Sequence, residues 1–401
     1  MSKSHFDIVI VGGGLVGMPL AYALRNQNFK IALIDAKPLP TNLNNTDGRA
    51  IALNYSSQKI LETLGLWETL ASYATPIETI QVSRRGVFAK TYLRAKDLRL
   101  KTLGYVVPAT ILASEIAKAL VKQDNITFFT PAQVENLVVH EKTADLTIKQ
   151  NGHLHTLTSR LIIAADGSQS SLAKMLHINH SVHDYQQTAI VATLKMTQSN
   201  QNCAYERFTK DGVIALLPLR QNEFGVVWTA DKSRAEELLA LSTEDYLKEL
   251  KQYVGQYWGT AVNLSARFGY PLTATEAAEN IRPRFVLLGN AAHTLHPVAA
   301  QGLNLALRSV AWLAEILSEA DGDVGDLFLL RRYKHQIESN QKTVQGLTHG
   351  LVELTHTVSS KTLWNVGLGL FDKVPFIKRS FMRRVAGVAG EQAKLARGVE
   401  L

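Results

Sequence analysis

The sequence is poor in cysteine, since Cys203 is the only one among 401 residues. A single cysteine excludes an internal disulfide framework, fits a reducing compartment and is an ordinary small apolar core residue. The sequence also lacks any run of about 18 uninterrupted apolar residues, and it begins without the charged, apolar and small-residue segments of an export signal. We therefore expect a cytoplasmic protein without a membrane span.

Signatures of nucleic-acid binding are also missing. There is no zinc-finger spacing, no RNA-recognition motif and no long basic block before residue 378, so we expect no nucleic-acid partner. The formal charge of +8 would instead attract a phosphate-bearing cofactor or an acidic lipid. At this length, with 46% hydrophobic residues, the chain can bury the cores of two or three lobes.

The N-terminal stretch DIVIVGGGLVG begins a strand, helix, strand pattern that ends at Asp35. Gly12, Gly14 and Gly17 occupy the three positions of the dinucleotide fingerprint. The first permits the tight turn, the second lets the backbone approach a pyrophosphate, and the third lets helix and strand pack closely. Asp35 follows where a carboxylate accepts hydrogen bonds from ribose hydroxyls and disfavours the 2′-phosphate of NADP. The pattern predicts dinucleotide binding.

Two later segments repeat this arrangement. A buried strand over 161–165 ends at Asp166, which taken alone would be read as a turn or capping residue. A strand over 285–288 is followed by Gly289-Asn290 and then by a helix that begins near Gly302. Glycine at a helix start is expected where the backbone approaches another molecule closely.

These motifs resemble those of the flavin-dependent aromatic hydroxylases, which have a glutathione-reductase-like FAD fold. The resemblance implies that the glycine fingerprint holds the ADP half of FAD. The stretch from Gly289 to Asn304 would hold the ribityl chain and the flavin ring, and Pro297 would offer its carbonyl beside the reacting phenol. The helix near Gly302 would point its amides at the ring, where reduction places negative charge. The cofactor-binding residues implied are Gly12, Gly14, Leu15, Val16, Gly17, Asp35, Arg49, Val134, Asp166, Gly289, Asn290, Pro297, Gly302, Leu303 and Asn304.

The sequence departs from the family pattern at three positions. Asn290 replaces the usual acid, Ala300 replaces a frequent glycine, and Ala173 stands where many relatives have an arginine. His293 and His296 are spaced as metal ligands can be, but no cluster of cysteines or carboxylates accompanies them, so we expect no metal.

The segment TDGRAIALNYSSQ resembles the branch of the family that acts in ubiquinone biosynthesis. Arg49 lies between apolar residues at what reads as a helix start, which favours a buried partner, and by family analogy it is catalytic together with Pro297. The pairing of Asn290 with Ala173 resembles members that hydroxylate 2-polyprenyl-6-methoxyphenol.

The resemblance implies a monooxygenase that uses O₂, with NAD(P)H as a transient electron donor, and that hydroxylates a polyprenylated phenol through a flavin C4a-hydroperoxide. Three alternatives stay open at this point. They are a sister hydroxylase acting at another ring position, a flavin reductase of prenyl double bonds, and a non-catalytic flavin-binding scaffold.

We expect a mixed α/β fold, in which a Rossmann-type FAD domain carries an inserted β-sheet substrate domain and C-terminal helices. The FAD domain is expected over 1–72, 101–175 and 281–350, the substrate domain over 73–100 and 176–280, and the helical segment over 351–401. One face of the inserted sheet would line an apolar pocket. The residues predicted to contact the substrate there are Leu216, Pro218 and Trp228.

The C-terminal segment is basic and amphipathic. On a helix, Ile377, Phe381, Val385 and Val388 form one stripe, with Lys378 and Arg384 at its flanks and Arg379 and Arg383 opposite. Such a stripe is typical of a helix packed on its own core. It also fits contact with an anionic membrane surface, which a lipid-tailed substrate would require, and this indicates peripheral attachment to the inner membrane as an alternative. Membership of a ubiquinone-biosynthesis complex is a second possible association.

Overall fold

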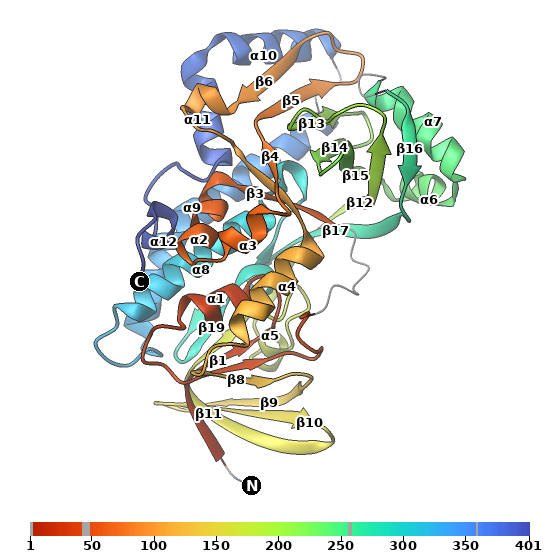
Figure 1. Cartoon of the computed structure of the whole chain (residues 1–401). Coiled ribbons are helices and arrows are strands. Elements are labelled where there is room, and N and C mark those ends of the chain that lie inside the picture. The colour runs from red at the N-terminus through yellow and green to blue at the C-terminus, as the bar shows by residue number, and fades with distance from the viewer. Residues whose placement is uncertain (1–2, 42–48, 256–258, 358–359) are drawn as a thin grey trace.

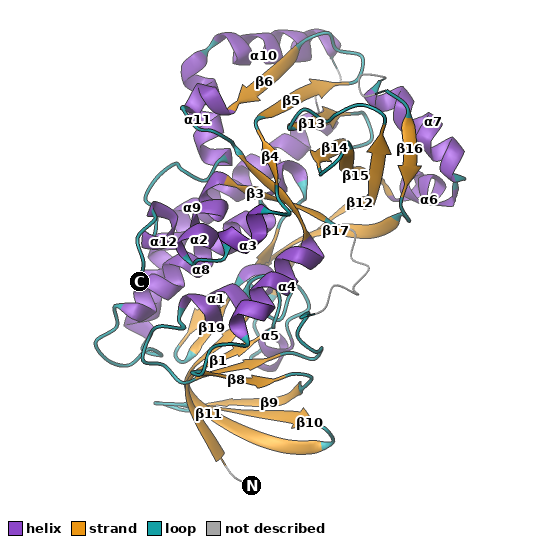
Figure 2. Ribbon diagram, in the orientation of Figure 1, coloured by secondary structure: helices purple, strands orange, loops and turns teal. Residues whose placement is uncertain are grey.

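The computed structural model describes residues 3–41, 49–255, 259–357 and 360–401. Its mixed α/β architecture confirms the fold class expected from the sequence. One sheet and the start of the chain lie at one end of the molecule, and strands β5 (Thr79–Arg84) and β6 (Lys90–Arg94) lie with α10 (Lys361–Lys373) at the other end (Figure 1). Helices gather between the two ends and along one side (Figure 2).

The first sheet has the order β18-β19-β11-β1-β2-β8, in which β19, β11, β1, β2 and β8 are parallel and β18 is antiparallel to β19. Strand β10 pairs antiparallel with β11, and β9 pairs antiparallel with β10. Every residue of β2 is buried, as expected of a parallel strand covered on both faces. One face packs on α1, α4 and α8, and the other packs on α5. The bounds of its strands are β1 Lys3–Val11, β2 Ile31–Ile34, β8 Ile126–Phe129, β9 Gln133–Val139, β10 Ala144–Gln150, β11 His153–Ala164, β18 Ile281–Arg282 and β19 Phe285–Leu287.

The second sheet has the order β20-β17-β12-β15-β14-β13-β5-β6, with β16 paired to β12. Strand β20 (His293–Thr294) follows β19 of the first sheet along the chain, after the η2 turn, but it pairs with β17 at the edge of the second sheet. The remaining strands are β12 His180–Met196, β13 Cys203–Phe208, β14 Val213–Pro218, β15 Glu223–Asp231, β16 Ala261–Leu264 and β17 Phe268–Ala277. A small sheet of β3 (Ala50–Asn54), β7 (Gly104–Pro108) and β4 (Thr75–Ile77) accompanies the two larger ones.

Helix α8 (Gly302–Ser318) is the central helix of the fold. Every residue from Asn304 to Leu317 is buried, so the helix is covered on all sides, and it packs against α9 and the first sheet. The other helices are α1 Gly17–Ala23, α2 Tyr55–Thr63, α3 Trp67–Ala71, α4 Ala109–Leu120, α5 Ser171–Met175, α6 Lys232–Ala240, α7 Thr243–Val254, α9 Leu327–Thr357, α11 Pro375–Val385 and α12 Lys394–Arg397. Short 3₁₀ turns occur at η1 Ala95–Leu98, η2 Gly289–Ala291 and η3 Val298–Ala300.

Helices α6 and α7 were not expected, because the sequence indicated only strands in this region. They cover one face of the second sheet, where Trp228 packs on Tyr246 and Tyr253 with ring centroids 5.5 and 5.0 Å apart. These aromatic contacts close the core of the second lobe.

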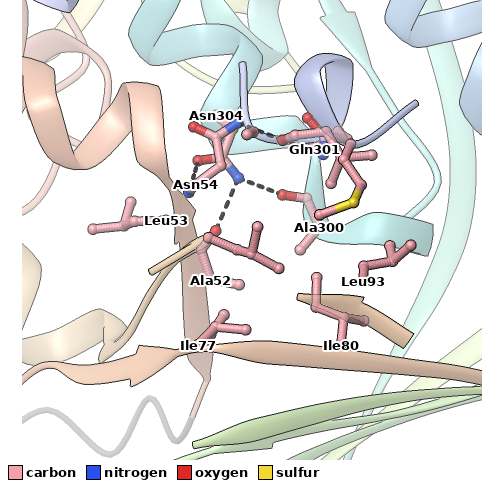
Figure 3. A pocket seen from close by; sticks show the side chains of 13 residues that line it. Ala52, Leu53, Asn54, Ile77, Ile80, Leu93, Ala300, Gln301 and Asn304 are labelled. Atoms are coloured by element: carbon pink, nitrogen blue, oxygen red, sulfur yellow. Dashed lines mark hydrogen bonds between the residues drawn. The ribbon is translucent and has the colours of Figure 1, made fainter. Parts of the chain in front are cut away.

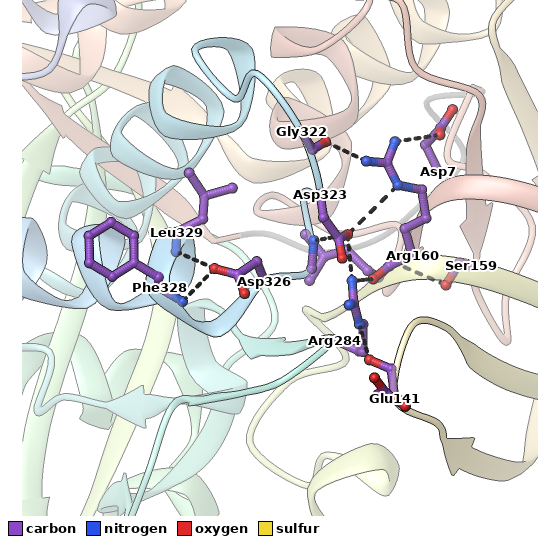
Figure 4. Close-up of polar contacts among 12 residues, drawn as sticks. Asp7, Glu141, Ser159, Arg160, Arg284, Gly322, Asp323, Asp326, Phe328 and Leu329 are labelled. Carbon is purple, nitrogen blue, oxygen red and sulfur yellow. Dashed lines mark hydrogen bonds and ion pairs between the residues drawn. The ribbon is translucent and has the colours of Figure 1, made fainter.

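An ion-pair network joins the loop between α8 and α9 to the first sheet (Figure 4). Asp323 accepts a hydrogen bond from Arg284 and lies 3.8 Å from Arg160, which in turn lies 3.2 Å from Asp7. Burial opposes ionisation of Asp323, but the hydrogen bond and charge of Arg284, with the charge of Arg160, outweigh it and hold the pKa of Asp323 below its usual value. Arg284 immediately precedes β19, so the network fixes the edge of the sheet opposite to the strand ends described below.

The C-terminal stripe is partly corrected by the structure. Helix α11 ends at Val385, so Val388 lies outside it. Lys378 does not flank the stripe at the surface, because it is 8% exposed and its Nζ lies 2.9 Å from Asp372 and 3.6 Å from Asp97. Phe381 packs edge-on against Phe371 at 5.5 Å. One side of α11, with Lys378 and Met382 buried, therefore packs against the protein, and the rest of the helix is exposed or half-buried.

Candidate functional site

Four strands of the first sheet end side by side. Val11 of β1 is in register with Ile34 of β2 and with Ala164 of β11, and Ala164 is in register with Leu287 of β19. The segments that follow these four residues therefore emerge at one edge of the sheet. In an open sheet of this kind, ligands bind outside the carboxyl ends of the strands.

The three fingerprint glycines after β1 differ in the space around them: two are closely packed by the protein, and one faces open space. A Cβ atom on Gly12, whose φ is +113°, would lie 2.2 Å from the Ala165 carbonyl oxygen, and one on Gly17 would lie 1.9 Å from the Gly12 oxygen. A Cβ atom on Gly14 would meet nothing within 4 Å. Gly12 and Gly17 are thus required by the packing of the protein itself, whereas the space at Gly14 is free for a ligand.

Asp35 holds this loop through its carboxylate. Its Oδ2 accepts a 2.6 Å hydrogen bond from the Gly13 N–H, and its Oδ1 accepts one of 2.7 Å from the Lys37 N–H. The side chain is only half-buried, so it also faces the open edge. A carboxylate fixed in this way can accept further hydrogen bonds from sugar hydroxyls.

Asp166 lies at the same edge, after β11. Its Oδ2 accepts hydrogen bonds from the backbone N–H and the hydroxyl of Ser171, at 2.8 and 3.1 Å, and so adds to the N-terminal cap of α5 that Ser170 provides. Its Oδ1 is buried and has no hydrogen-bond partner among the described residues. A donor brought by a ligand or a water molecule would be stabilised there. Ala173, on α5, is 1% exposed and packs in the core, which leaves no room for the arginine found in many relatives.

The two glycine turns from opposite ends of the chain touch each other. Gly289 has a φ of +62°, and a Cβ atom there would lie 3.0 Å from a γ-methyl group of Val16, next to α1. Asn290 beside it is exposed. Leu15 lies just before α1 and Leu303 lies in the first turn of α8. Both side chains are half-buried and pack against the same hydrophobic core. Val134 is farther along the sheet, on β9, where it is half-buried against the opposite core.

The first turn of α8 is fastened to β3 by Asn304 (Figure 3). Its side-chain amide donates hydrogen bonds to the carbonyl oxygens of Ala52, at 2.8 Å, and Ala300, at 2.6 Å, and its oxygen accepts one of 2.8 Å from the Asn54 N–H. The side chain is 2% exposed. Both side-chain N–H groups of Asn304 bind the protein backbone, so its side chain positions the start of α8, and the binding of a cofactor by Asn304 stays a prediction.

Ala300 adopts a left-handed conformation with a φ of +48°. Glycine is favoured at such positions, because a Cβ atom there is strained. The departure noted in the sequence therefore falls on the one turn that connects Pro297 to α8. Gly302 at the helix start has open space where a Cβ atom would lie.

The turn before Ala300 is held by His296, which is 2% exposed. Its Nδ1 accepts a 3.2 Å hydrogen bond from the Val298 N–H, which places the ring proton on Nε2, directed to the Gln187 amide oxygen 3.1 Å away. His293 is also buried, and burial lowers the pKa of its ring to about 4. The His296 ring thus supports the turn that begins at Pro297, and the His293 ring is part of the buried interior.

A small apolar cavity of about 60 Å³ opens between the start of α8, β3 and the second sheet (Figure 3). Gln301 and Asn304 line it from α8 and its N-terminal flank, and Met382 lines it from α11. No pattern in the sequence indicated that α11 reaches this cavity. The remaining lining residues are Ala52, Leu53, Asn54, Ile77, Ile80, Leu93, Leu103, Ala300, Val385 and Ala386.

The predicted substrate contacts are corrected by the structure. Leu216 and Trp228 are 1% and 2% exposed and belong to the core beneath α6 and α7. Pro218 is two residues from Leu216 and so lies on the same face of β14. Leu217 of β14 and its partner Gly225 of β15 lie on the opposite face of the sheet. A Cβ atom on Gly225 would lie 2.4 Å from the Ala50 Cβ, so this face is the one that packs toward β3. The alternation of β14 was therefore assigned to the wrong face.

Arg49 is also placed differently from expectation. It is exposed and precedes a strand, β3, whereas α2 begins only at Tyr55. Its carbonyl accepts a 2.9 Å hydrogen bond from Ala109 at the start of α4. Asp47 and Gly48 of the same motif lie outside the described residues.

The arrangement fits FAD. The open cradle at Gly14 can admit a pyrophosphate, Asp35 can accept from a ribose, and the turn at Gly289 leads along the same edge toward α8. Within the described ranges, no His, Cys, Asp or Glu side chains are grouped as a metal site would require. None of the helices there is long and apolar enough to cross a bilayer.

Known proteins resemble this chain along almost its whole length. The family model described as an FAD binding domain matches residues 5–345. The ubiquinone hydroxylase UbiL of Rhodospirillum rubrum is 33% identical, over 98% of this chain and 93% of the relative. The ubiquinone hydroxylase UbiM of Neisseria meningitidis is 30% identical, over 96% of this chain and 85% of the relative. The crystal structure of p-nitrophenol 4-monooxygenase from Pseudomonas putida superposes with a TM-score of 0.80, at 15% identity, over 98% of this chain and 100% of the other.

Proposed function

Since the chain belongs to the FAD binding domain family and is a flavin-dependent aromatic monooxygenase, we propose that it hydroxylates the ring of a polyprenylated phenol in ubiquinone biosynthesis. The observation that carries the proposal is the meeting of two glycine turns at one sheet edge, from which α8 leads to an apolar cavity. We further propose 2-polyprenyl-6-methoxyphenol as the substrate, because the pairing of Asn290 with Ala173 resembles the members that act on it.

In this proposal the first sheet's edge binds the cofactor. Backbone N–H groups after Gly12 face the pyrophosphate, and the carboxylate of Asp35 faces the adenosine ribose. The exposed amide of Asn290 can bind a ribityl hydroxyl without adding charge. Asn304 keeps the first turn of α8 against β3, so that the helix N-terminus is directed at the flavin ring and stabilises negative charge there.

The cavity beside α8 would receive the phenol ring. Its walls are mainly aliphatic, so they exclude water and strengthen the electrostatic effect of the helix terminus. Bound FAD supplies the activation of O₂. One oxygen atom replaces a ring hydrogen as a hydroxyl group, the other leaves as water, and NAD(P)H supplies the two electrons. The chain's own contribution is to orient the ring. The Pro297 carbonyl accepts a 2.9 Å hydrogen bond from the Ala300 N–H, and in this proposal its second lone pair accepts from the phenol.

We also propose that the far end of the second lobe rests on an anionic membrane surface. Phe376 and Ile377 of α11 are 82% and 53% exposed. Arg379 and Arg383 line a hollow beside them, together with Lys96 and Arg99. Exposed apolar side chains next to arginines are typical of interfacial helices.

The membrane contact is tested by changing these exposed residues, since removing all of α11 would open the cavity lined by Met382. Replacing Phe376 and Ile377 by serine should reduce cosedimentation with vesicles that contain anionic phospholipid. The exposed Phe328 of α9 offers a control, because Phe328→Ser should leave vesicle binding unchanged. Equal binding by all three proteins would refute the proposed surface.

The enzymatic proposal is tested with the purified protein, FAD, NAD(P)H and 2-polyprenyl-6-methoxyphenol under ¹⁸O₂. The expected result is a hydroxylated product that carries one labelled oxygen atom, with flavin bleaching by NAD(P)H accelerated by the phenol. Unlabelled product, or reduction of prenyl double bonds, would contradict the proposal. Hydroxylation of another polyprenylated phenol, with no turnover of this one, would overturn only the assignment of the substrate.

A further inference from the structure

A second and larger cavity lies apart from the cofactor edge. It has a volume of about 430 Å³, within the range of cavities that bury small ligands. Its floor is the second sheet, and its walls are α10 and α11. Its lining includes Val82 and Leu93 of the sheet and Leu363, Trp364, Gly367 and Phe381 of the two helices.

The lining of this groove is almost entirely hydrocarbon. The Thr91 hydroxyl, which is the exception, donates a 2.8 Å hydrogen bond to Asp372 and is thereby satisfied. Trp364 packs against Phe208 with ring centroids 5.6 Å apart. Because such walls offer water few hydrogen bonds, an apolar occupant is favoured over solvent.

The groove adjoins the small cavity beside α8. Leu93 of β6 lines both, and one apolar cluster contains Leu93 and Met382 together with Val82, Phe371 and Phe381. On β5, Ile80 lines the small cavity and Val82 lines the groove, two residues farther on the same face. Leu93, which is 3% exposed, separates the two spaces, so a chain attached to a ring in the small cavity would reach the groove by displacing this one side chain.

The outer end of the groove reaches exposed apolar side chains of α10. Leu363, which lines the groove, is 63% exposed, and Val366 and Leu370 of the same helix are 53% and 57% exposed. A hydrocarbon longer than the groove would remain in contact with apolar surface as it emerges.

We infer that the groove between β5, β6 and α10–α11 binds the isoprenoid tail of the substrate, with Leu93 at the junction between ring and tail. This inference rests on the proposed hydroxylase function and adds the part of the substrate that the groove holds. An isoprenoid tail fits better than a peptide, because a peptide brings backbone N–H and C=O groups for which these walls have no partners.

Gly367 provides a test that leaves the fold intact. It lines the groove on α10, and a Cβ atom there would meet nothing within 4 Å. Gly367→Leu fills the groove with a better helix former. Gly369 lies on the same helix, is equally open at Cβ and does not line the groove, so Gly369→Leu is the matched control.

The first measurement is the binding of farnesol, an isoprenoid alcohol without a phenol ring, to the FAD-loaded protein, followed by the fluorescence of Trp364. We expect Gly367→Leu to weaken binding by about ten-fold, equal to about 1.4 kcal/mol, and Gly369→Leu to leave it unchanged. The fluorescence response should disappear in Trp364→Phe. Unchanged farnesol affinity in Gly367→Leu would overturn the inference.

The second measurement separates this inference from the proposed function. Gly367→Leu should raise the KM for the polyprenylated phenol and leave that for the tailless 2-methoxyphenol unchanged. Equal effects on both phenols would refute the groove as a tail site. Gly367-dependent farnesol binding without turnover of any phenol would refute the hydroxylase function alone. A groove that is covered by a second copy of the chain would show itself by dissociation of an oligomer in Gly367→Leu, and this also overturns the inference.

Discussion

The side-chain oxygen of Asn304 accepts a 2.8 Å hydrogen bond from the backbone N–H of Asn54, while its amide donates to Ala52 on the same strand. This pair of bonds joins the start of α8 to the end of β3. The position of the helix N-terminus is therefore set by one buried amide.

Asn304→Asp should be more harmful than Asn304→Ala. An aspartate has no N–H to donate, so its charge would face the carbonyl oxygens of Ala52 and Ala300. We expect a loss of about 3 kcal/mol in unfolding free energy, against about 2 kcal/mol for alanine, and weaker FAD binding in both. Chemical denaturation and flavin fluorescence titration measure these effects. If aspartate were tolerated as well as alanine, the donor role of Asn304 would be wrong.

The glycine loop should separate folding from cofactor binding. Gly14→Val places its side chain in open space, so the protein should fold with an unchanged Tm but retain no FAD. Gly17→Ala brings a Cβ to 1.9 Å from the Gly12 oxygen and should lower the Tm even without FAD. Thermal unfolding of the apoproteins and the flavin absorbance of the purified variants distinguish the two effects. A flavin-loaded Gly14→Val protein would rule out the predicted pyrophosphate position.

Ala300→Gly should stabilise the protein by about 1 kcal/mol, since it removes left-handed strain at a φ of +48°. The carbonyl that accepts from Asn304 is retained. Asn222 has a φ of +66°, but asparagine tolerates this conformation, so Asn222→Gly should give a smaller gain. Urea denaturation compares the two, and an equal or reversed order would show that the turn at Ala300 is not strained.

Asn340→Asp should also stabilise the fold. Arg308 is 4% exposed, and burial lowers its pKa to about 10. Its Nη2 donates a 3.2 Å hydrogen bond to the Asn340 side-chain oxygen, whereas its Nε and Nη1 have no partner among the described residues. A carboxylate keeps this bond and adds a counter-charge, which should contribute about 1 kcal/mol at neutral pH. The gain should vanish on acidification, when the new carboxyl is protonated, and a gain that persists in acid would exclude this explanation.

The buried His293 should make stability fall in mild acid. Its pKa is about 4 in the folded protein, below the value of about 6.5 expected in the unfolded chain. As the pH falls below about 6.5, the unfolded chain binds a proton that the folded protein does not, so unfolding is favoured by up to about 3 kcal/mol near pH 4. His293→Gln should flatten the curve of unfolding free energy over this interval. A parallel curve for the variant would assign the acid sensitivity to other groups.

Local patterns were sufficient to predict much of the cofactor edge. The alternation from buried strand to glycine turn to helix identified β1, β19 and the start of α8, because each depends on neighbours in sequence. The contact between Val16 and Gly289 could only be expected from the family resemblance, because it requires β1, β11 and β19 to pair in that order.

The face of β14 that meets the core could not be predicted, because the side chains on both of its faces are apolar. Leu216 and Leu217 alternate on β14, and either could face a pocket until α6 and α7 are placed on one side. Residues 50–54 read as a helix start, but pairing with β7 makes them a strand. Tertiary pairing outweighs local preference in such short segments. The boundaries of the FAD and substrate domains and the roles of the site residues stay predictions.

The two-residue strand β20 has a mechanical consequence. His293 and Thr294 pair with Glu276 and Thr275 of the second sheet, only a few residues after the Gly289 turn of the first and just before Pro297. Any movement of one lobe relative to the other must therefore displace the paired residues of β20 and β17. Motion of the substrate lobe would therefore be transmitted directly to the loop that supports Pro297, without a flexible tether to absorb it.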